Sequence, residues 1–172
     1  MYYDLLLKTV KAREKAEELG LKTFAFSDLQ PKDRTKSYDP DKIVFVRGGT
    51  LEQNKKIVRS PCDVLLDATL VDSSVVQVAN DNDVAFGISL HQFLYSRGMK
   101  RARLFLYYQR LLKLYDKMDA KVLLVSGANN NFEVRPPKQL ISMGVFLGQT
   151  KQQAKWSVTQ VPEYLISKKV SE

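Results

Sequence analysis

Short apolar runs alternate with amphipathic stretches along this sequence, and the alternation restricts the fold more than any other feature. Helical patterns separate the apolar runs at roughly 20 to 25 residues per unit, which favours parallel strands joined by right-handed crossovers. Six runs have the length and composition of buried strands: 2–7, 22–27, 42–48, 63–68, 84–90 and 120–126. Six strands are too few for a full eight-stranded barrel. We therefore expect an α/β fold in one domain over 1–172, with parallel strands surrounded by helices, in a sheet that is either open or closed as a shortened or irregular TIM-like barrel.

Residues that begin and end helices stand between these runs. Gly20 follows a helical pattern and tolerates the positive φ that is common after a helix end. Thr50 and Gln53 have the spacing of a capping box, and Asp72 and Thr150 are further candidate N-caps. The expected helices are 9–19, a short helix from Thr50, 73–79, 100–118, one after Thr150 and one with Pro162 in its first turn, and the polar segment 28–42 is an expected loop.

The composition excludes several classes of protein. Cys62 is the single cysteine, so an intramolecular disulfide is impossible and a small buried thiol is expected. No stretch approaches the roughly 18 apolar residues of a membrane span, and no signal-peptide pattern is present. We therefore expect a soluble, cytoplasmic protein with no membrane partner.

The positive charge is concentrated in one part of the chain. The whole sequence has a net charge of +8. Residues 1–96 carry 13 basic and 14 acidic side chains, whereas residues 97–138 carry 10 basic and 3 acidic ones. Such a local excess is typical of a surface that binds phosphates.

The expected helix over 100–118 determines where much of this charge points. Its apolar residues share one face that can pack on the sheet: Leu104, Tyr108, Leu111, Leu112, Tyr115 and Met118. Arg103, Arg110 and Lys117 follow one another at intervals of seven on the opposite face, with Lys113 between them. This face is either a solvated surface or a phosphate-binding ridge that continues from Arg97, Lys100 and Arg101.

Polar residues follow the expected strands, at the positions where parallel α/β proteins place their functional side chains. They are Asp28, Arg47, Asp67, His91, Ser126 and Asn129 to Asn131. One histidine and two carboxylates do not suffice for a catalytic metal centre of several histidines and carboxylates. We therefore expect Asp28 and Asp67 as caps or ion-pair partners, and His91 as solvated or locally hydrogen-bonded. Trp156 is expected in the core rather than as a stacking platform.

The segment after the last expected strand combines small residues with a stiffened arginine. Ser126, Gly127 and Ala128 allow the backbone to pass close to a neighbour, and the three asparagines that follow tolerate left-handed turns. Pro136 restricts Arg135 to an extended conformation, which reduces the entropy lost when its guanidinium binds an anion. The alternative is that Arg135 ties the loop to a carboxylate such as Glu133 or Asp67.

The same region carries a family resemblance. The run from Val125 to Lys168, with Ser-Gly-Ala at 126–128, "VRPPKQLISMG" and "LGQTKQQAK", resembles the C-terminal half of archaeal ribonuclease P protein component 3, a relative of the thirty-kilodalton subunit of the eukaryotic enzyme. "CDVLLDA", "NDNDVAFGISLHQFLYSRGMKRARL" and the opening "YYDLLL" also fit the family. The similarity spans almost the whole chain, although this chain is short for the family.

The resemblance implies a subunit of the ribonucleoprotein that removes the 5′ leader from precursor tRNA. It implies that catalysis belongs to the ribonuclease P RNA and its Mg²⁺ ions, with no cofactor on this chain. The implied partners are that RNA, an RRM-like component 2 protein, the other protein subunits and the precursor tRNA. The implied fold is a shortened barrel similar to those of the PHP phosphoesterases, whose metal-binding histidines have no match here.

We predict no catalytic and no metal-binding residue in this chain. The predicted RNA-binding residues are Arg97, Lys100, Arg101, Arg103, Arg110, Arg135 and Lys138. Two alternative hypotheses remain at this point: a stand-alone metal-dependent phosphoesterase on a PHP-like barrel, and a module whose basic segment binds an acidic protein.

Overall fold

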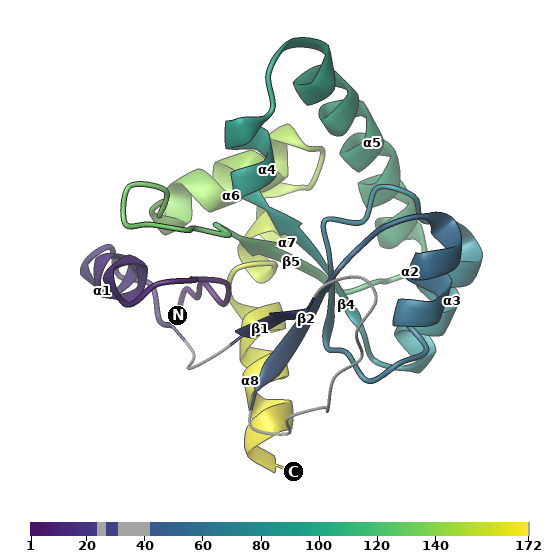
Figure 1. The fold of residues 1–172 in the computed structure, drawn as a ribbon, viewed down its shortest axis with the longest axis horizontal. Coiled ribbons are helices and arrows are strands. Elements are labelled where there is room, and N and C mark those ends of the chain that lie inside the picture. The colour runs from purple at the N-terminus through teal and green to yellow at the C-terminus, as the bar shows by residue number, and fades with distance from the viewer. Residues whose placement is uncertain (24–26, 31–41, 172) are drawn as a thin grey trace.

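A parallel sheet forms the centre of the molecule (Figure 1). The computed structural model describes residues 1–23, 27–30 and 42–171. Within them the strands are β1 (Ser27–Gln30), β2 (Ile43–Arg47), β3 (Val64–Leu66), β4 (Ala85–Ser89) and β5 (Val122–Val125). Every neighbouring pair is parallel, and the strands follow one another in sequence order. Sequential order is the arrangement of a TIM-like barrel, in which each crossover leads to the adjacent strand.

The N-terminal segment is the main correction to the expected strands. Residues 2–7 do not form a regular strand, but make isolated parallel bridges between Tyr3 and Lys22 and between Leu7 and Ala128. Lys22 precedes β1 and Ala128 follows β5, so this segment lies between the two edges of the sheet. The ladder with β5 is interrupted because the backbone N–H of Ser126 donates to the Asp4 carboxylate (3.2 Å) instead of to a carbonyl. The barrel is therefore closed irregularly.

The start of the next strand also differs from the prediction. The sequence predicts a strand over 22–27, whereas β1 begins at Ser27 and extends to Gln30, within the segment that we expected to be a loop. Asp28 is therefore inside a strand and not beyond its end. Residues 24–26 and 31–41 lie outside the described residues. The sequence does not predict β1 because its residues are mostly polar. This edge strand is defined by its pairing with Ile43–Val46 of β2 and not by an apolar pattern.

The helices are α1 (Val10–Glu18), α2 (Leu51–Ile57), α3 (Ser73–Asp81), α4 (Leu90–Tyr95), α5 (Gly98–Lys117), α6 (Pro137–Phe146), α7 (Lys151–Trp156) and α8 (Gln160–Ser171). Of these, α2, α3 and α7 begin directly after an N-cap that the sequence predicts. Thr50 and Thr150 both make complete capping boxes, with Gln53 and Gln153 respectively. Asp72 caps α3 as predicted. Helix α4 was not predicted; it follows β4 without a connecting loop.

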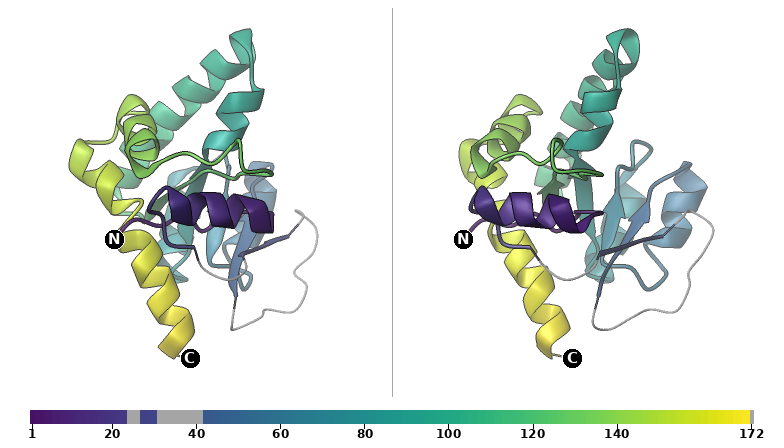
Figure 2. Two further views of the ribbon diagram at one scale, coloured as in Figure 1. Left: turned by 90° about the vertical axis from the view of Figure 1, so that its left-hand side faces the viewer. Right: turned by 60° about the vertical axis from the view of Figure 1, so that its left-hand side comes forward.

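Both faces of the sheet are buried, as expected for parallel strands. Successive residues of β2 point to opposite faces of the sheet. Val44 packs in the core between the sheet and the outer helices, and Phe45 packs in the core on the other face, which we call the inner face. The inner core also contains Leu6 of the N-terminal segment and Leu165 of α8. The N-terminal segment and α8 thus cover the face that further strands would enclose in a full barrel (Figure 2).

Two ion-pair groups attach α8 to the amino ends of the strands. The Lys169 ammonium is buried and lies 3.0 Å from the Asp63 carboxylate, which also accepts from the backbone N–H of Val44 (2.7 Å). Asp83 binds Lys121, Lys168 and the Tyr164 hydroxyl. No helix in the described part of the chain is long and apolar enough to cross a bilayer.

Candidate nucleic-acid interface

Asp67 connects the exits of two neighbouring strands. It lies directly after β3 with a φ of 54°, a left-handed conformation that Asp tolerates better than most residues. Its carboxylate accepts from the backbone N–H of Ser89 (2.8 Å), from the Ser89 hydroxyl (2.7 Å) and from the Gln92 amide (2.8 Å). Burial raises the pKa of Asp67, although the hydrogen bonds from Ser89 oppose the shift. These bonds show Asp67 as a cap between strand ends, one of the two roles predicted for it.

Glu133 organises the loop between β5 and α6. Its carboxylate accepts from the Tyr95 hydroxyl (2.6 Å), the Asn130 amide (2.7 Å) and the backbone N–H of Asn129 (3.0 Å), and it lies 3.0 Å from Nδ1 of His91. Burial by itself would raise the pKa of Glu133, but the hydrogen bonds from Asn129, Tyr95 and His91 outweigh it and hold the pKa at about 2. The predicted local hydrogen bonding of His91 is confirmed. Through His91 and Tyr95, α4 is fixed against this loop.

The small residues after β5 are required by a close approach of two chain segments. Gly127 has a φ of 65°, and a Cβ atom on it would lie 3.0 Å from Cβ of Ser89 and 3.2 Å from Cβ of His91. A larger residue would combine strain in the left-handed region with this crowding. Ser126 and Ala128 are both fully buried. The prediction that the backbone passes close to a neighbour here is confirmed.

Arg135 is held by the backbone of its own loop. One guanidinium nitrogen donates to the carbonyl of Phe132 (2.5 Å) and to that of Val134 (3.0 Å). The alternative in which Arg135 binds Glu133 or Asp67 is not what the hydrogen bonds show, because those carboxylates are satisfied by His91, Ser89 and their neighbours. The half-buried Arg135 therefore stabilises a turn with one guanidinium nitrogen, and the other N–H donors of its guanidinium make no hydrogen bond to the described residues.

The long helix presents its basic residues to solvent, as its periodicity predicts. Tyr108, Leu111, Leu112 and Tyr115 are buried against the sheet. Exposed basic residues occupy the N-cap and the outer face of α5: Arg97, Lys100, Arg101, Arg103, Arg110, Lys113 and Lys117. Lys138 is exposed in the first turn of α6. The beginnings of α5 and α6 lie on the same side of the sheet, above the carboxyl ends of the strands (Figure 1).

The predicted RNA-binding residues thus form two groups. Five belong to the start and outer face of α5, whereas Arg135 lies in the β5–α6 connection and Lys138 in the first turn of α6. Helix α4, which precedes α5 in the chain, binds Glu133 of the β5–α6 loop through His91 and Tyr95. These hydrogen bonds connect the segment that carries the first group to the loop that carries Arg135. We call these seven residues the basic surface. Arg101 is the only one of the α5 group with a side-chain hydrogen bond in the described part of the chain, donated to the Ser96 carbonyl (2.7 Å).

Two other predicted residues have different outcomes. Cys62 is a buried thiol, as predicted, and burial raises its pKa to about 12. Trp156 is 42% exposed and lines a cavity between α5 and α7, so its predicted place in the core is wrong. Among the described residues, no group of three or more His, Cys, Asp or Glu is arranged to hold a metal ion.

Comparison with known proteins identifies the family. The model of the family described as RNase P subunit p30 matches residues 7–170. The chain belongs to this family. Ribonuclease P protein component 3 of Methanosarcina barkeri is 30% identical over 132 residues, which cover 73% of this chain and 55% of the relative. The protein of the same name in Archaeoglobus fulgidus is 27% identical, over 78% of this chain and 69% of the relative. This p30-family chain therefore spans about half the length of the Methanosarcina relative.

Solved structures confirm the predicted type of fold. A chain in the cryo-EM structure of archaeal ribonuclease P with mature tRNA superposes with a TM-score of 0.74 at 20% identity, covering 98% of this chain and 83% of that one. An amidohydrolase superposes with a TM-score of 0.57 at 11% identity, covering 74% of this chain and 33% of that one. The p30-family chain is therefore a shortened, irregular TIM-like barrel, since its described residues lack the strand count of a complete one.

Proposed function

We propose that this chain is a protein subunit of ribonuclease P, the ribonucleoprotein that cleaves the 5′ leader from precursor tRNA. The observation that carries the proposal is the basic surface on a chain of the RNase P subunit p30 family. The relatives named as ribonuclease P components support this function over a stand-alone phosphoesterase. In this proposal the endonuclease activity resides in the RNA with its Mg²⁺ ions, and this chain supplies neither a catalytic residue nor a cofactor.

The proposed partners are the ribonuclease P RNA, an RRM-like component 2 subunit and the other protein subunits, with precursor tRNA as the substrate of the assembly. The basic surface would contact phosphates of the RNA and thereby stabilise its folded shape. Phosphate contacts fix the position of a protein on a nucleic acid but do not read its sequence. This agrees with a role in which double-stranded RNA is recognised by its shape.

The start of α5 supports the proposal on electrostatic grounds. A helix N-terminus carries a partial positive charge and unsatisfied N–H groups, which favour acidic side chains. The N-cap of α5 is Arg97, it makes no side-chain capping bond, and the first turn contains Lys100 but no acidic residue. This arrangement is unfavourable in the free protein. A phosphate would satisfy the free N–H groups and neutralise the cations at once.

The dependence of RNA binding on salt tests the proposal. Arg103 and Arg110 lie on the exposed face of α5 and make no side-chain hydrogen bond within the described residues, so Arg103→Ala/Arg110→Ala should leave the fold intact. If each arginine contacts one phosphate, the double variant should lower the slope of log affinity against log salt by about 1.4 to 1.8. Binding to an archaeal ribonuclease P RNA and pre-tRNA cleavage at low Mg²⁺, with the other protein subunits present, are the measurements.

A matched variant separates this surface from general charge effects. Lys11→Ala/Lys151→Ala removes two exposed cations from α1 and α7, and it should leave the salt slope almost unchanged. Equal slopes for the wild type and the α5 double variant would contradict the proposal. Equal losses in the two double variants would show that net charge, rather than the basic surface, determines binding.

A further inference from the structure

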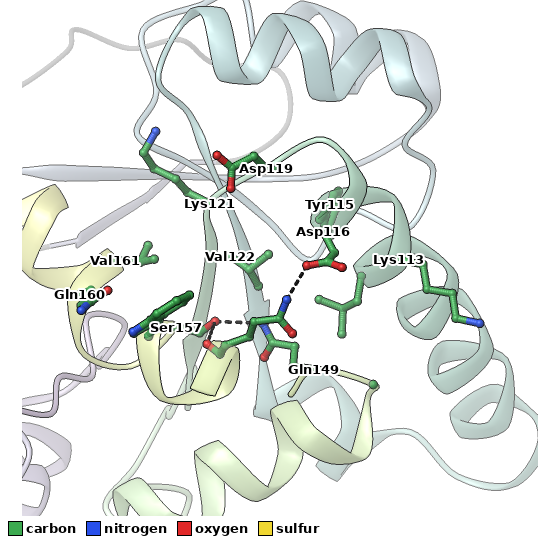
Figure 3. A pocket seen from close by; sticks show the side chains of 15 residues that line it. Lys113, Tyr115, Asp116, Asp119, Lys121, Val122, Gln149, Ser157, Gln160 and Val161 are labelled. Carbon is green, nitrogen blue, oxygen red and sulfur yellow. Dashed lines mark hydrogen bonds between the residues drawn. The ribbon is translucent and has the colours of Figure 1, made fainter. Parts of the chain in front are cut away.

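A cavity of about 340 Å³ opens between the end of α5, α7 and the start of α8 (Figure 3). It lies beside the amino end of β5, at Lys121 and Val122, away from the strand exits where Glu133 organises the loop. Its volume falls within the range of small-ligand sites. Trp156, the single tryptophan of the chain, forms part of its lining and remains 42% exposed. An exposed tryptophan in a concave site offers a flat apolar surface to a ligand.

The other walls of the cavity are polar. The amide of Gln153 donates to a carboxylate oxygen of Asp116, and the amide of Gln149 donates to the Ser157 hydroxyl (3.0 Å), as the dashed lines in Figure 3 show. Hydrogen-bond donors and acceptors therefore stand beside the aromatic ring. These groups already bind one another, and each amide N–H₂ and the Asp116 carboxylate keep further hydrogen-bonding capacity that a polar ligand can use.

The cavity also has one available cation among the described residues. Lys121 is bound to Asp83 (2.8 Å), and its ammonium lies over the ring of Tyr164, 5.1 Å from the centroid. Lys113, in contrast, makes no hydrogen bond and no ion pair with any residue that the structure describes. It lines the cavity from the exposed face of α5, continuous with Arg110 of the basic surface. Its ammonium points away from the cavity in Figure 3, so it can attract a phosphate of a bound strand at the rim but not inside the cavity.

We propose that the cavity binds one unpaired nucleotide of RNA, with its base stacked on Trp156, while Lys113 attracts the phosphates of the strand from the rim of the cavity. This inference rests on the proposed RNA-binding function and adds a site that contacts a base, whereas the basic surface contacts phosphates alone. Stacking of unpaired bases on aromatic side chains is a general means of binding single-stranded RNA. The Asp116 carboxylate and the second N–H of the Gln149 and Gln153 amides supply the remaining hydrogen-bonding capacity for the edge of the base.

Tryptophan fluorescence of the full chain, excited at a wavelength that tyrosine does not absorb, tests the stacking directly, because Trp156 is then the sole source of the signal. Three probes with equal numbers of phosphates are compared: a single-stranded oligoadenylate, an abasic oligonucleotide and a short RNA duplex. Anisotropy of a label on each probe reports binding independently. We expect the oligoadenylate to quench Trp156, and the abasic strand and the duplex to bind without quenching.

Substitutions in the cavity provide the second readout. Stacking of one base corresponds to about 5- to 150-fold in affinity, so Trp156→Ala should weaken oligoadenylate binding by a factor in this range. Trp156→Phe should restore most of the affinity, and neither variant should alter abasic binding. Lys113→Ala should weaken all three probes alike. Phe146→Ala, at an exposed aromatic residue outside the cavity, is the matched control.

The outcomes separate the two proposals. Binding of oligoadenylate without quenching, or with no loss in Trp156→Ala, overturns the nucleotide site and leaves the ribonuclease P proposal in place. Equal quenching by the abasic strand also overturns it, because the base is then not the ligand. Failure of every probe to bind, together with unchanged salt slopes in the α5 variants, overturns the RNA-binding function itself.

Discussion

Asp4 illustrates how one residue replaces part of a strand ladder. Its carboxylate is almost completely buried, where it accepts from the backbone N–H groups of Ser126 (3.2 Å) and Leu6 (3.4 Å). A buried charge is unfavourable unless it is paired, and no cation pairs with Asp4 in the described part of the chain. Burial accordingly raises the pKa of Asp4 to about 6, although these hydrogen bonds oppose the shift. The irregular closure of the barrel therefore depends on a titrating group.

This raised pKa gives a stability prediction with a definite sign. The folded state binds the proton of Asp4 more tightly than the unfolded chain, whose carboxyl has a pKa of 3.8. The contribution of Asp4 is therefore fully present below pH 3.8 and is lost as the pH rises through about 6. We expect it to lower the free energy of unfolding by about 3 kcal/mol between pH 4 and pH 7. Asp4→Asn, which does not titrate, should abolish this part of the pH dependence.

Urea unfolding of the wild type and of Asp4→Asn at pH 4, 5, 6 and 7 measures the effect. The difference in stability between the two proteins should change steadily with pH in favour of the variant at pH 7. Asp81→Asn, at the exposed end of α3, is the control for the loss of a carboxylate. A difference between Asp4→Asn and the wild type that stays constant from pH 4 to pH 7 would contradict the assignment.

At the scale of the element, the two halves of α5 differ in how deeply they are buried. Its second half is buried through Tyr108, Leu111, Leu112 and Tyr115, whereas its first half exposes Met99 and Leu106, and the cations lie on the outer face of both halves. The start of the helix follows neither the capping nor the charge preferences of a stable helix. Binding sites commonly keep such unfavourable features, so that stabilising substitutions reduce function.

Arg97→Asp should consequently have opposite effects on stability and on RNA binding. The backbone of Arg97 already has the extended conformation of an N-cap, with φ −130° and ψ 157°. An aspartate there adds a hydrogen-bond acceptor and a favourable charge, so we expect about 1 to 2 kcal/mol of stabilisation in thermal or urea unfolding. RNA affinity should fall, and the salt slope should decrease by about 0.7 to 0.9.

Arg97→Ser separates capping from charge in the same experiment. It should provide most of the capping stabilisation without a negative charge, and a smaller loss of RNA affinity than Arg97→Asp. If both variants are no more stable than the wild type, the backbone N–H groups in the first turn of α5 already have hydrogen-bond partners in the free protein. The electrostatic support for the phosphate site would then be lost.

At the scale of the whole molecule, the two ends of the chain complete the barrel. The N-terminal segment bridges the edges of the sheet, and α8 covers its inner face and is anchored at the amino ends of the strands. The Lys169–Asp63 pair is part of this anchor and is shielded from water on both sides, with side chains 1% and 2% exposed. A buried pair contributes little beyond an apolar replacement, but removal of one partner leaves an unpaired charge.

Lys169→Met should therefore destabilise the protein by about 3 to 5 kcal/mol, because Asp63 would remain buried without its cation. In the double variant Asp63→Asn/Lys169→Met, the neutral amide at position 63 can still accept from the backbone N–H of Val44, so most of the lost stability should return. Chemical denaturation of the four proteins of the cycle measures the coupling. Additive effects of the two substitutions would show that the two side chains do not act as a pair.

Features that depend on short stretches of chain were predictable. The capping boxes at Thr50 and Thr150 and the buried face of α5 follow from spacings of three and four residues, which the sequence displays directly. Strands β2 to β5 are apolar enough to be recognised because both of their faces are buried. The concentration of cations on the outer face of α5 and in the connection to α6 follows from the same local patterns.

The sequence by itself thus determined the type of fold, the N-caps of α2, α3 and α7, and the basic stretch. Only the tertiary structure decided that 2–7 bridges two edges instead of forming a strand, that Arg135 binds its own loop, and that Trp156 lines a cavity. Each of these depends on which groups from distant parts of the chain occupy the neighbouring space. The hydrogen-bond partners and the burial of a residue depend on these tertiary contacts, and local sequence patterns do not show which contacts form.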